Sequence, residues 1–217
     1  MSIDAAQLAA AKRPPEDDRH TRILQAAERA FVRYGFHAAT MLQVADEAGM
    51  SAGNLYRYFP SKEAIVEGLC GRDQAERAAN FAALAQSPRV FEALAYGLRQ
   101  HLLTKPPEKA RMILEVWAEG SRNPRIARTG REIDQNVCSG LVQVFERAKA
   151  NGEAAASLDS DFACRLMFTL VGGLFKRLAH EPDFDVETES AMALGVLRAL
   201  LDGAIGPWKP YQSQGPK

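Results

Sequence analysis

The fold of this chain is decided by the stretch Ser51-Ala52-Gly53-Asn54-Leu55-Tyr56-Arg57-Tyr58-Phe59-Pro60-Ser61-Lys62. Serine is a favoured N-cap residue and proline cannot continue a helix, so we expect a helix of about two turns between Ser51 and Pro60. Leu55 and Phe59 lie four residues apart. They share one face of this helix, which we expect to point into a core.

The other face of this short helix has an unusual composition. At about 100° per residue, Gly53, Asn54 and Arg57 face outward, while Tyr56 and Tyr58 fall on the two flanks. A helix in the DNA major groove needs small residues for close approach, polar groups for base edges and donors for the phosphates on either side. The simpler alternative is a polar helix surface with two half-buried tyrosines. The two segments that precede the stretch favour DNA binding.

Those two segments also read as helices. The first is expected from about residue 18 to 34, where Gly35 ends it. Thr40 is the expected cap of a second helix, and Gly49 stops it just before the short helix begins. Two short helices joined by a tight turn that contains glycine form the helix-turn-helix pattern.

Residues from about Arg22 to Glu63 resemble the DNA-binding domain of the TetR/AcrR family of bacterial repressors. The resemblance is carried by the runs Thr40-Met41-Leu42-Gln43-Val44-Ala45 and Ala48-Gly49-Met50-Ser51, and by the stretch quoted above. It implies a homodimer on a palindromic operator and a helical second domain that binds a small molecule and then releases the DNA. It also makes efflux or detoxification genes the expected targets.

The resemblance assigns roles to individual positions. It implies phosphate contacts from Thr40, Ser51, Tyr56, Tyr58 and Lys62. It places Ala52, Gly53 and Asn54 nearest the bases, and the outward face adds Arg57 behind them. Ala52 departs from the polar or basic residue that many relatives carry there, and its methyl group can contact only a thymine methyl. Some sequence specificity is therefore expected to come from DNA shape.

The rest of the chain continues as helices, so the predicted fold class is all-α with about nine helices. The expected division is a flexible N-terminal arm at 1–17, a helix-turn-helix domain at 18–63, a ligand-binding and dimerisation domain at 64–206, and a C-terminal tail at 207–217.

Two late segments, about 160–179 and 186–203, are apolar on nearly every face. A helix with no polar face is buried from all sides, and a second subunit is the simplest cover in a small domain. The alternative is an intramolecular core. The predicted dimer interface consists of Phe162, Leu166, Leu170, Gly173, Leu174, Met192, Val196 and Leu200.

Bulky side chains in the middle helices suggest a site for a lipophilic effector, although such residues more often form plain core. The ligand-binding candidates are Phe81, Met112, Trp117, Phe145 and Phe168. Trp117 lies between Glu115 and Glu119, which would suit a cationic ligand. Helical geometry places both carboxylates away from the ring, so a solvated pair is the better interpretation.

Composition limits the other possibilities. The chain has 27 Lys and Arg against 27 Asp and Glu, so DNA affinity must come from a local patch. Three scattered cysteines, no signal sequence, and a longest apolar run (166–175) of half a membrane span predict a cytoplasmic protein that does not enter a membrane.

The sequence contains no catalytic or metal-binding motif, and its four histidines lie far apart. We therefore expect no enzyme activity, no cofactor and no metal. The alternative function is a helical dimer that binds small molecules without specific DNA binding.

Overall fold

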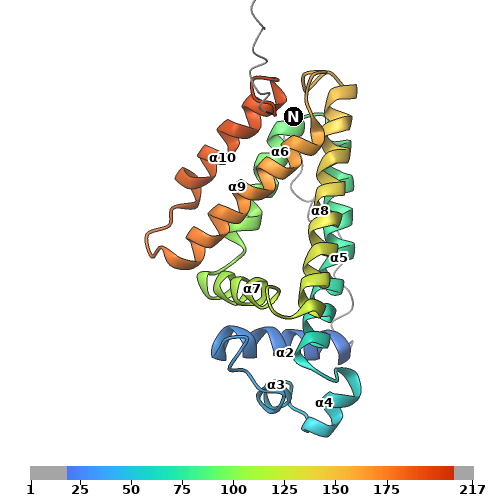
Figure 1. Ribbon diagram of the computed structural model, residues 1–217, viewed down its shortest axis with the longest axis vertical. Helices are drawn as coiled ribbons and strands as arrows, with labels where there is room; N and C mark the ends of the chain where they lie inside the picture. The colour runs from blue at the N-terminus through green and yellow to red at the C-terminus, as the bar shows by residue number, and fades with distance from the viewer. Residues whose placement is uncertain (1–18, 208–217) are drawn as a thin grey trace, which may run out of the picture.

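The computed structural model describes residues 19–207, so the predicted arm at 1–17 and nearly all of the predicted tail at 207–217 lie outside the described residues. Within this range every regular element is an α-helix, as predicted (Figure 1). The helices are α2 (Arg19–Tyr34), α3 (Met41–Glu47), α4 (Ala52–Tyr58), α5 (Lys62–Gln86), α6 (Val90–Leu103), α7 (Pro107–Glu119), α8 (Pro124–Ala150), α9 (Ser160–His180) and α10 (Val186–Leu201).

Helices α2, α3 and α4 form a small unit at one end of the molecule, which we call the head (Figure 1). Its helices begin where the capping residues predict. The Thr40 hydroxyl accepts a hydrogen bond from the Gln43 amide, and the Gln43 side chain accepts one from the Thr40 amide. The Ser51 hydroxyl accepts a hydrogen bond from the Asn54 amide at 3.3 Å. Gly35 and Gly49 follow α2 and α3 with φ of 79° and 67°, which only glycine adopts at little cost.

Helices α5 to α10 form the larger part of the molecule, which we call the body. The long helices α5 and α8 run side by side and parallel, while α6, α9 and α10 pack together on the other side (Figure 1). The body has its own hydrophobic core, in which Phe145, Leu174 and Leu200 are fully buried.

Helix α7 lies across the junction between head and body (Figure 1). Met112 of α7 and Ile126 at the start of α8 belong to the core of the head, together with Phe31, Val44 and Leu55. Ile113 packs against both cores. The two cores therefore meet at α7, and the head completes its core with residues from the body.

Candidate nucleic-acid interface and effector site

The head presents α4 with its polar face outward. Leu55 has no exposed surface and Phe59 is almost fully buried, so both hold the helix against the head core. Gly53, Arg57 and the two tyrosines that flank it are exposed on the opposite side. A Cβ added to Gly53 would meet nothing within 4 Å, so this glycine is not required by packing inside the chain. The geometry leaves the outer surface of α4 free to approach another molecule.

A cavity of about 190 Å³ lies beside the N-terminus of α4. Arg19 and Arg22 of α2 line one side of it, and the Gly49 turn, Ser51 and Asn54 line the other. Guanidinium groups beside a hydroxyl suit a phosphate oxygen. The two arginines are not among the DNA contacts predicted from the sequence. Their position in the first turns of α2, a basic helix start, is the signal that points to them.

The side chains predicted to contact phosphates differ in whether their hydroxyl groups already donate hydrogen bonds within the protein. Thr40 Oγ1 lies 3.1 Å from Gln43 Oε1 and donates its proton there, so this hydroxyl is occupied within its own cap. The Ser51 hydroxyl only accepts within its cap, and its proton remains available for a phosphate. Tyr56 and Tyr58 are both exposed, so their hydroxyl groups can reach a DNA backbone.

Lys62 has an internal role that the sequence did not indicate. Its ammonium donates to the carbonyl oxygens of Phe36 at 2.7 Å and His37 at 2.9 Å, and it lies 4.9 Å from the centre of the Phe36 ring. The side chain thereby fastens the α2–α3 loop to the start of α5. An ammonium has three donors, so one remains for a phosphate, and that contact stays a prediction.

The predicted solvated pair of Glu115 and Glu119 is wrong. Glu115 accepts a hydrogen bond from the Phe36 amide at 2.5 Å, and its carboxylate lies against Gly35. Glu119 pairs with Arg122 at 2.8 Å and lies 3.6 Å from the His37 ring. Glu115 and Glu119 therefore both hold the α2–α3 loop of the head.

A second set of charges joins α2, α5 and α7. Glu28 pairs with Arg72 at 3.1 Å and also with Lys109. Burial raises the pKa of Glu28, but Lys109 and Arg72 outweigh it and hold the pKa below its usual value. The head is thus tied by ion pairs both to the long helix α5 and to α7.

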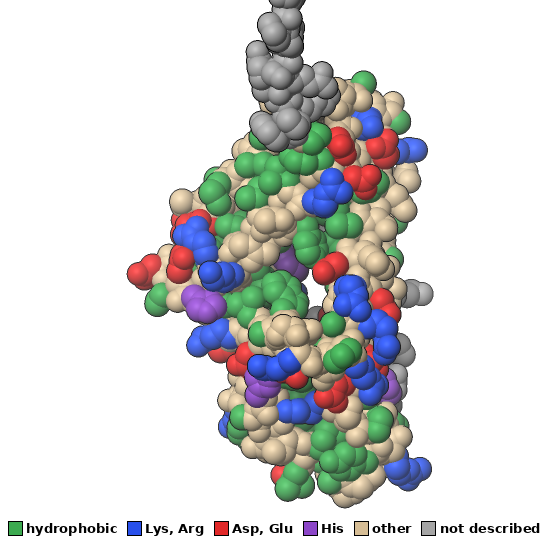
Figure 2. Space-filling view, viewed as in Figure 1, with side chains coloured by type: hydrophobic (Ala, Val, Ile, Leu, Met, Phe, Trp, Pro, Cys, Tyr) green, Lys and Arg blue, Asp and Glu red, His purple; other side chains and the backbone are tan. Residues whose placement is uncertain are grey.

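An opening is visible in the middle of the molecule, with hydrophobic side chains on one side and charged side chains on the other (Figure 2). Three rings from three of the surrounding helices lie together: Phe175 of α9 is 5.7 Å from Trp117 of α7 and 5.9 Å from His101 of α6, centroid to centroid. Trp117 is 52% exposed, which is unusual for a large apolar ring inside a fold. Of these three, only Trp117 was predicted from the sequence.

His101 is the titratable ring of this cluster. The ring keeps exposed surface, yet the protein crowds it on several sides. Desolvation, followed by the positive charges of Lys105 and Arg77, lowers its pKa to about 4. At neutral pH this cluster therefore contains a neutral imidazole beside two aromatic rings.

The other predicted ligand residues are placed differently. Phe145 is fully buried in the body core and Met112 is buried in the head core, and their role in ligand binding stays a prediction. Phe81 and Phe168 are half-buried. A Cβ on Gly140 would lie 2.5 Å from the Phe81 ring, so Phe81 is packed into the contact between α5 and α8. Aromatic residue type alone did not separate core from cavity.

The predicted dimer residues also divide into two groups. Leu174 and Leu200 are at most 1% exposed within one chain, so they belong to its own core and cannot contact a partner. On α9 and α10, Phe162, Leu166, Leu170 and Val196 remain partly exposed, and Gly173 and Met192 are exposed. These six leave an apolar surface over two neighbouring helices.

Two further classes of site were tested within residues 19–207. No group of three or more histidine, cysteine, aspartate or glutamate side chains there is arranged to hold a metal ion. None of the helices described is long and apolar enough to cross a membrane.

Comparisons with known proteins agree with this architecture. Residues 23–69 match the family of bacterial regulatory proteins called the tetR family, and residues 92–205 match the C-terminal domain of BetI-type transcriptional repressors. A helix-turn-helix head on a helical body defines a transcriptional regulator. The chain belongs to the TetR family.

Individual relatives are similar over nearly the whole chain. The transcriptional regulator UidR of Escherichia coli K12 is 28% identical over 85% of this chain and 92% of its own length. The structure of Salmonella enterica GusR covers 87% of this chain and 97% of its own, with 27% identity and a TM-score of 0.72. FadR of Bacillus subtilis, solved in complex with stearoyl-CoA, covers 85% and 98% with 21% identity and a TM-score of 0.71. UidR and FadR are both named as transcriptional regulators.

Proposed function

We propose that this protein is a repressor that binds a palindromic operator as a homodimer and leaves it when a small lipophilic effector binds the body. The observation that carries the proposal is the outer surface of α4, where an unpacked Gly53 lies among exposed polar side chains. It would act in the cytoplasm, where its DNA lies. Efflux or detoxification genes are the proposed targets.

The DNA-binding step would use two kinds of contact. Ala52, Gly53, Asn54 and Arg57 would lie toward the base edges, where small and amide side chains fit the major groove. The phosphate contacts would come from Ser51, Tyr56, Tyr58, the free donor of Lys62 and the two arginines of α2. Thr40 would contribute through the unpaired amides at the start of α3.

The dimer would place two heads on successive turns of one DNA face. The partly exposed apolar residues of α9 and α10 support this assembly, because such a surface is costly to leave in water. A single head with few base contacts binds weakly, and joining two heads raises the affinity strongly.

The effector would enter the opening beside Trp117, Phe175 and His101. A neutral imidazole and two aromatic rings favour a lipophilic molecule. The FadR complex shows that a molecule with a long acyl chain can bind a protein of this fold. Because Trp117 and Glu115 lie on the same helix, a shift of α7 upon binding would act directly on the α2–α3 loop.

Fluorescence anisotropy with labelled DNA from upstream of the gene for this protein tests the first step. We expect salt-sensitive binding, and a loss of about tenfold or more for Tyr56→Phe combined with Tyr58→Phe, because each lost hydrogen bond contributes about 1 kcal/mol. Tyr96→Phe is the matched control, since Tyr96 is an exposed tyrosine of the body. If the purified dimer binds no such DNA at low salt, the protein is a small-molecule-binding dimer instead.

A further inference from the structure

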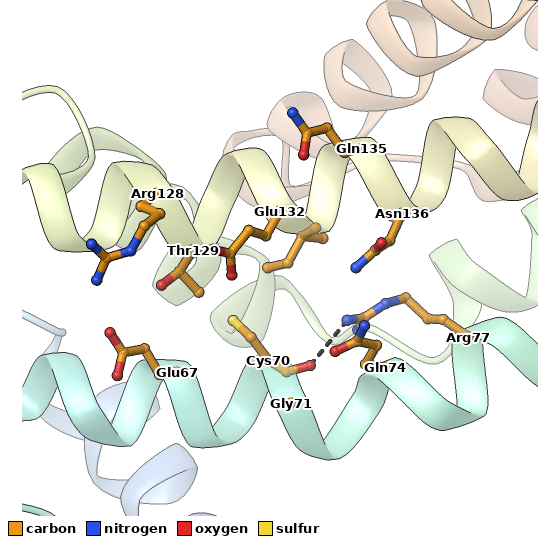
Figure 3. A pocket seen from close by; sticks show the side chains of 11 residues that line it. Glu67, Cys70, Gly71, Gln74, Arg77, Arg128, Thr129, Glu132, Gln135 and Asn136 are labelled. Atoms are coloured by element: carbon orange, nitrogen blue, oxygen red, sulfur yellow. Dashed lines mark hydrogen bonds between the residues drawn. The ribbon is translucent and has the colours of Figure 1, made fainter.

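A cavity lies between the parallel helices α5 and α8 and is lined by residues of both. Its volume is about 560 Å³, within the range of small-molecule sites. Figure 3 shows side chains from both helices pointing toward one another across it. Its lining is polar apart from Cys70 and Ile133, whereas the cluster of rings from α6, α7 and α9 is aromatic. We call it the α5–α8 cleft.

One end of the cleft holds an arginine that is only partly used. Arg77 donates to the Cys70 carbonyl at 3.0 Å, while its buried Nε atom has no hydrogen-bond partner among the described residues. A buried guanidinium N–H without a partner is costly and rare in a folded protein. Gln74 and Asn136 lie beside Arg77 and supply amide groups to the same space (Figure 3).

The charges in the cleft leave an excess of positive charge. Glu67 is held by Arg125 through two bonds of 2.6 Å, so its negative charge is compensated from outside the cleft. Arg128 lies at this end and Glu132 lies between the two arginines (Figure 3). The cleft therefore contains two guanidinium groups and one uncompensated carboxylate. A bound anion would be stabilised there, whereas a cation would be repelled by two like charges.

We propose that the α5–α8 cleft binds a small anionic molecule that also carries hydroxyl groups. Arg77 holds the carboxylate or phosphate group, and its Nε gains the partner that the described residues do not provide. The amides of Gln74 and Asn136 and the carboxylate of Glu132 bond the hydroxyl groups. The proposal concerns binding alone, and it stands or falls independently of DNA binding.

Isothermal titration calorimetry on the full-length protein tests this proposal with three probes of similar size. They are gluconate, which carries a carboxylate, glucose 6-phosphate, which carries a phosphate, and neutral glucose. We expect at least one of the two anions to bind at millimolar concentration or below and glucose to bind at least tenfold more weakly. Whichever anion binds identifies the preferred group. Failure of both anions at 10 mM, or equal binding of glucose, overturns the proposal.

Variants locate the site. Arg77→Gln is expected to weaken binding of the anion about tenfold or more, because a buried charge pair is lost. Arg131→Gln is the matched control, since Arg131 is exposed on α8 outside the cleft. Asn136→Ala changes an exposed residue and spares the fold, and it should weaken binding several-fold. Unchanged affinity in both Arg77→Gln and Asn136→Ala places the anion elsewhere and contradicts the proposal.

Discussion

The head and the body differ in the sequence distance over which their functional surfaces are assembled. The exposed face of α4 comes from residues 52–58, and its shape is set by caps and a turn that lie within a few residues. The aromatic cluster of the body combines His101, Trp117 and Phe175, one from each of three helices. Local sequence therefore determines the surface of the head, whereas tertiary packing determines that of the body.

The largest expected effect on stability comes from disturbing the packing of α4 on the core of the head. Leu55→Ala removes the fully buried side chain that holds α4 on the head core, and we expect the free energy of unfolding to fall by about 2–5 kcal/mol. Urea denaturation followed by circular dichroism measures the loss. Leu42→Ala on the neighbouring helix is the control, because Leu42 is 59% exposed, and it should change stability by less than about 0.5 kcal/mol. Equal losses in the two variants would contradict the assigned orientation of the head helices.

The sequence predicted the helices well, because capping residues, glycines and hydrophobic periodicity mark each helix locally. Thr40 and Ser51 cap helices in the structure as expected, and Gly35 takes the positive φ that is common just after a helix end. Periodicity also showed that Leu55 points inward.

The sequence could not separate core from surface in the body. Phe145 and Trp117 are both aromatic residues on amphipathic helices, yet one is fully buried and the other is half exposed. Which ring borders an opening depends on how far apart the helices stand, and no pattern along one helix encodes that distance. The same limit hid the contact between Glu115 and Phe36, which joins residues 79 positions apart.

A smaller effect is expected where the two regions meet. Glu115→Ala removes the acceptor of the partly buried Phe36 amide and should destabilise the protein by about 1–3 kcal/mol. It should also weaken the effect of an effector on DNA binding, because α7 would lose its hold on the α2–α3 loop. Thermal unfolding and anisotropy with and without effector measure the two consequences. Glu108→Ala, on the exposed start of the same helix, serves as the control. If it matches Glu115→Ala in both assays, the contact does not couple the regions.

The smallest effect concerns pH and the body alone. The pKa of His101 is about 4 in the folded protein and about 6.5 in an unfolded chain, so the unfolded state binds more protons between these values. Stability should therefore fall as the pH decreases from 6.5 toward 4. His101→Gln should flatten this dependence in melting temperatures recorded from pH 7.5 to 5. His180→Gln, at the exposed end of α9, should leave it unchanged. An equal slope in the wild type and His101→Gln would show that the imidazole is not desolvated.

The central claim is that the outer surface of α4 approaches DNA closely at Gly53. Gly53→Leu tests it most directly, because a side chain there meets nothing within the protein and the variant should fold normally. Gly130→Leu is the control, a partly exposed glycine of α8 with equally open surroundings outside the α5–α8 cleft. We predict that Gly53→Leu weakens operator binding at least about tenfold in fluorescence anisotropy, while Gly130→Leu binds like the wild type. Wild-type affinity in a folded Gly53→Leu dimer would contradict the account.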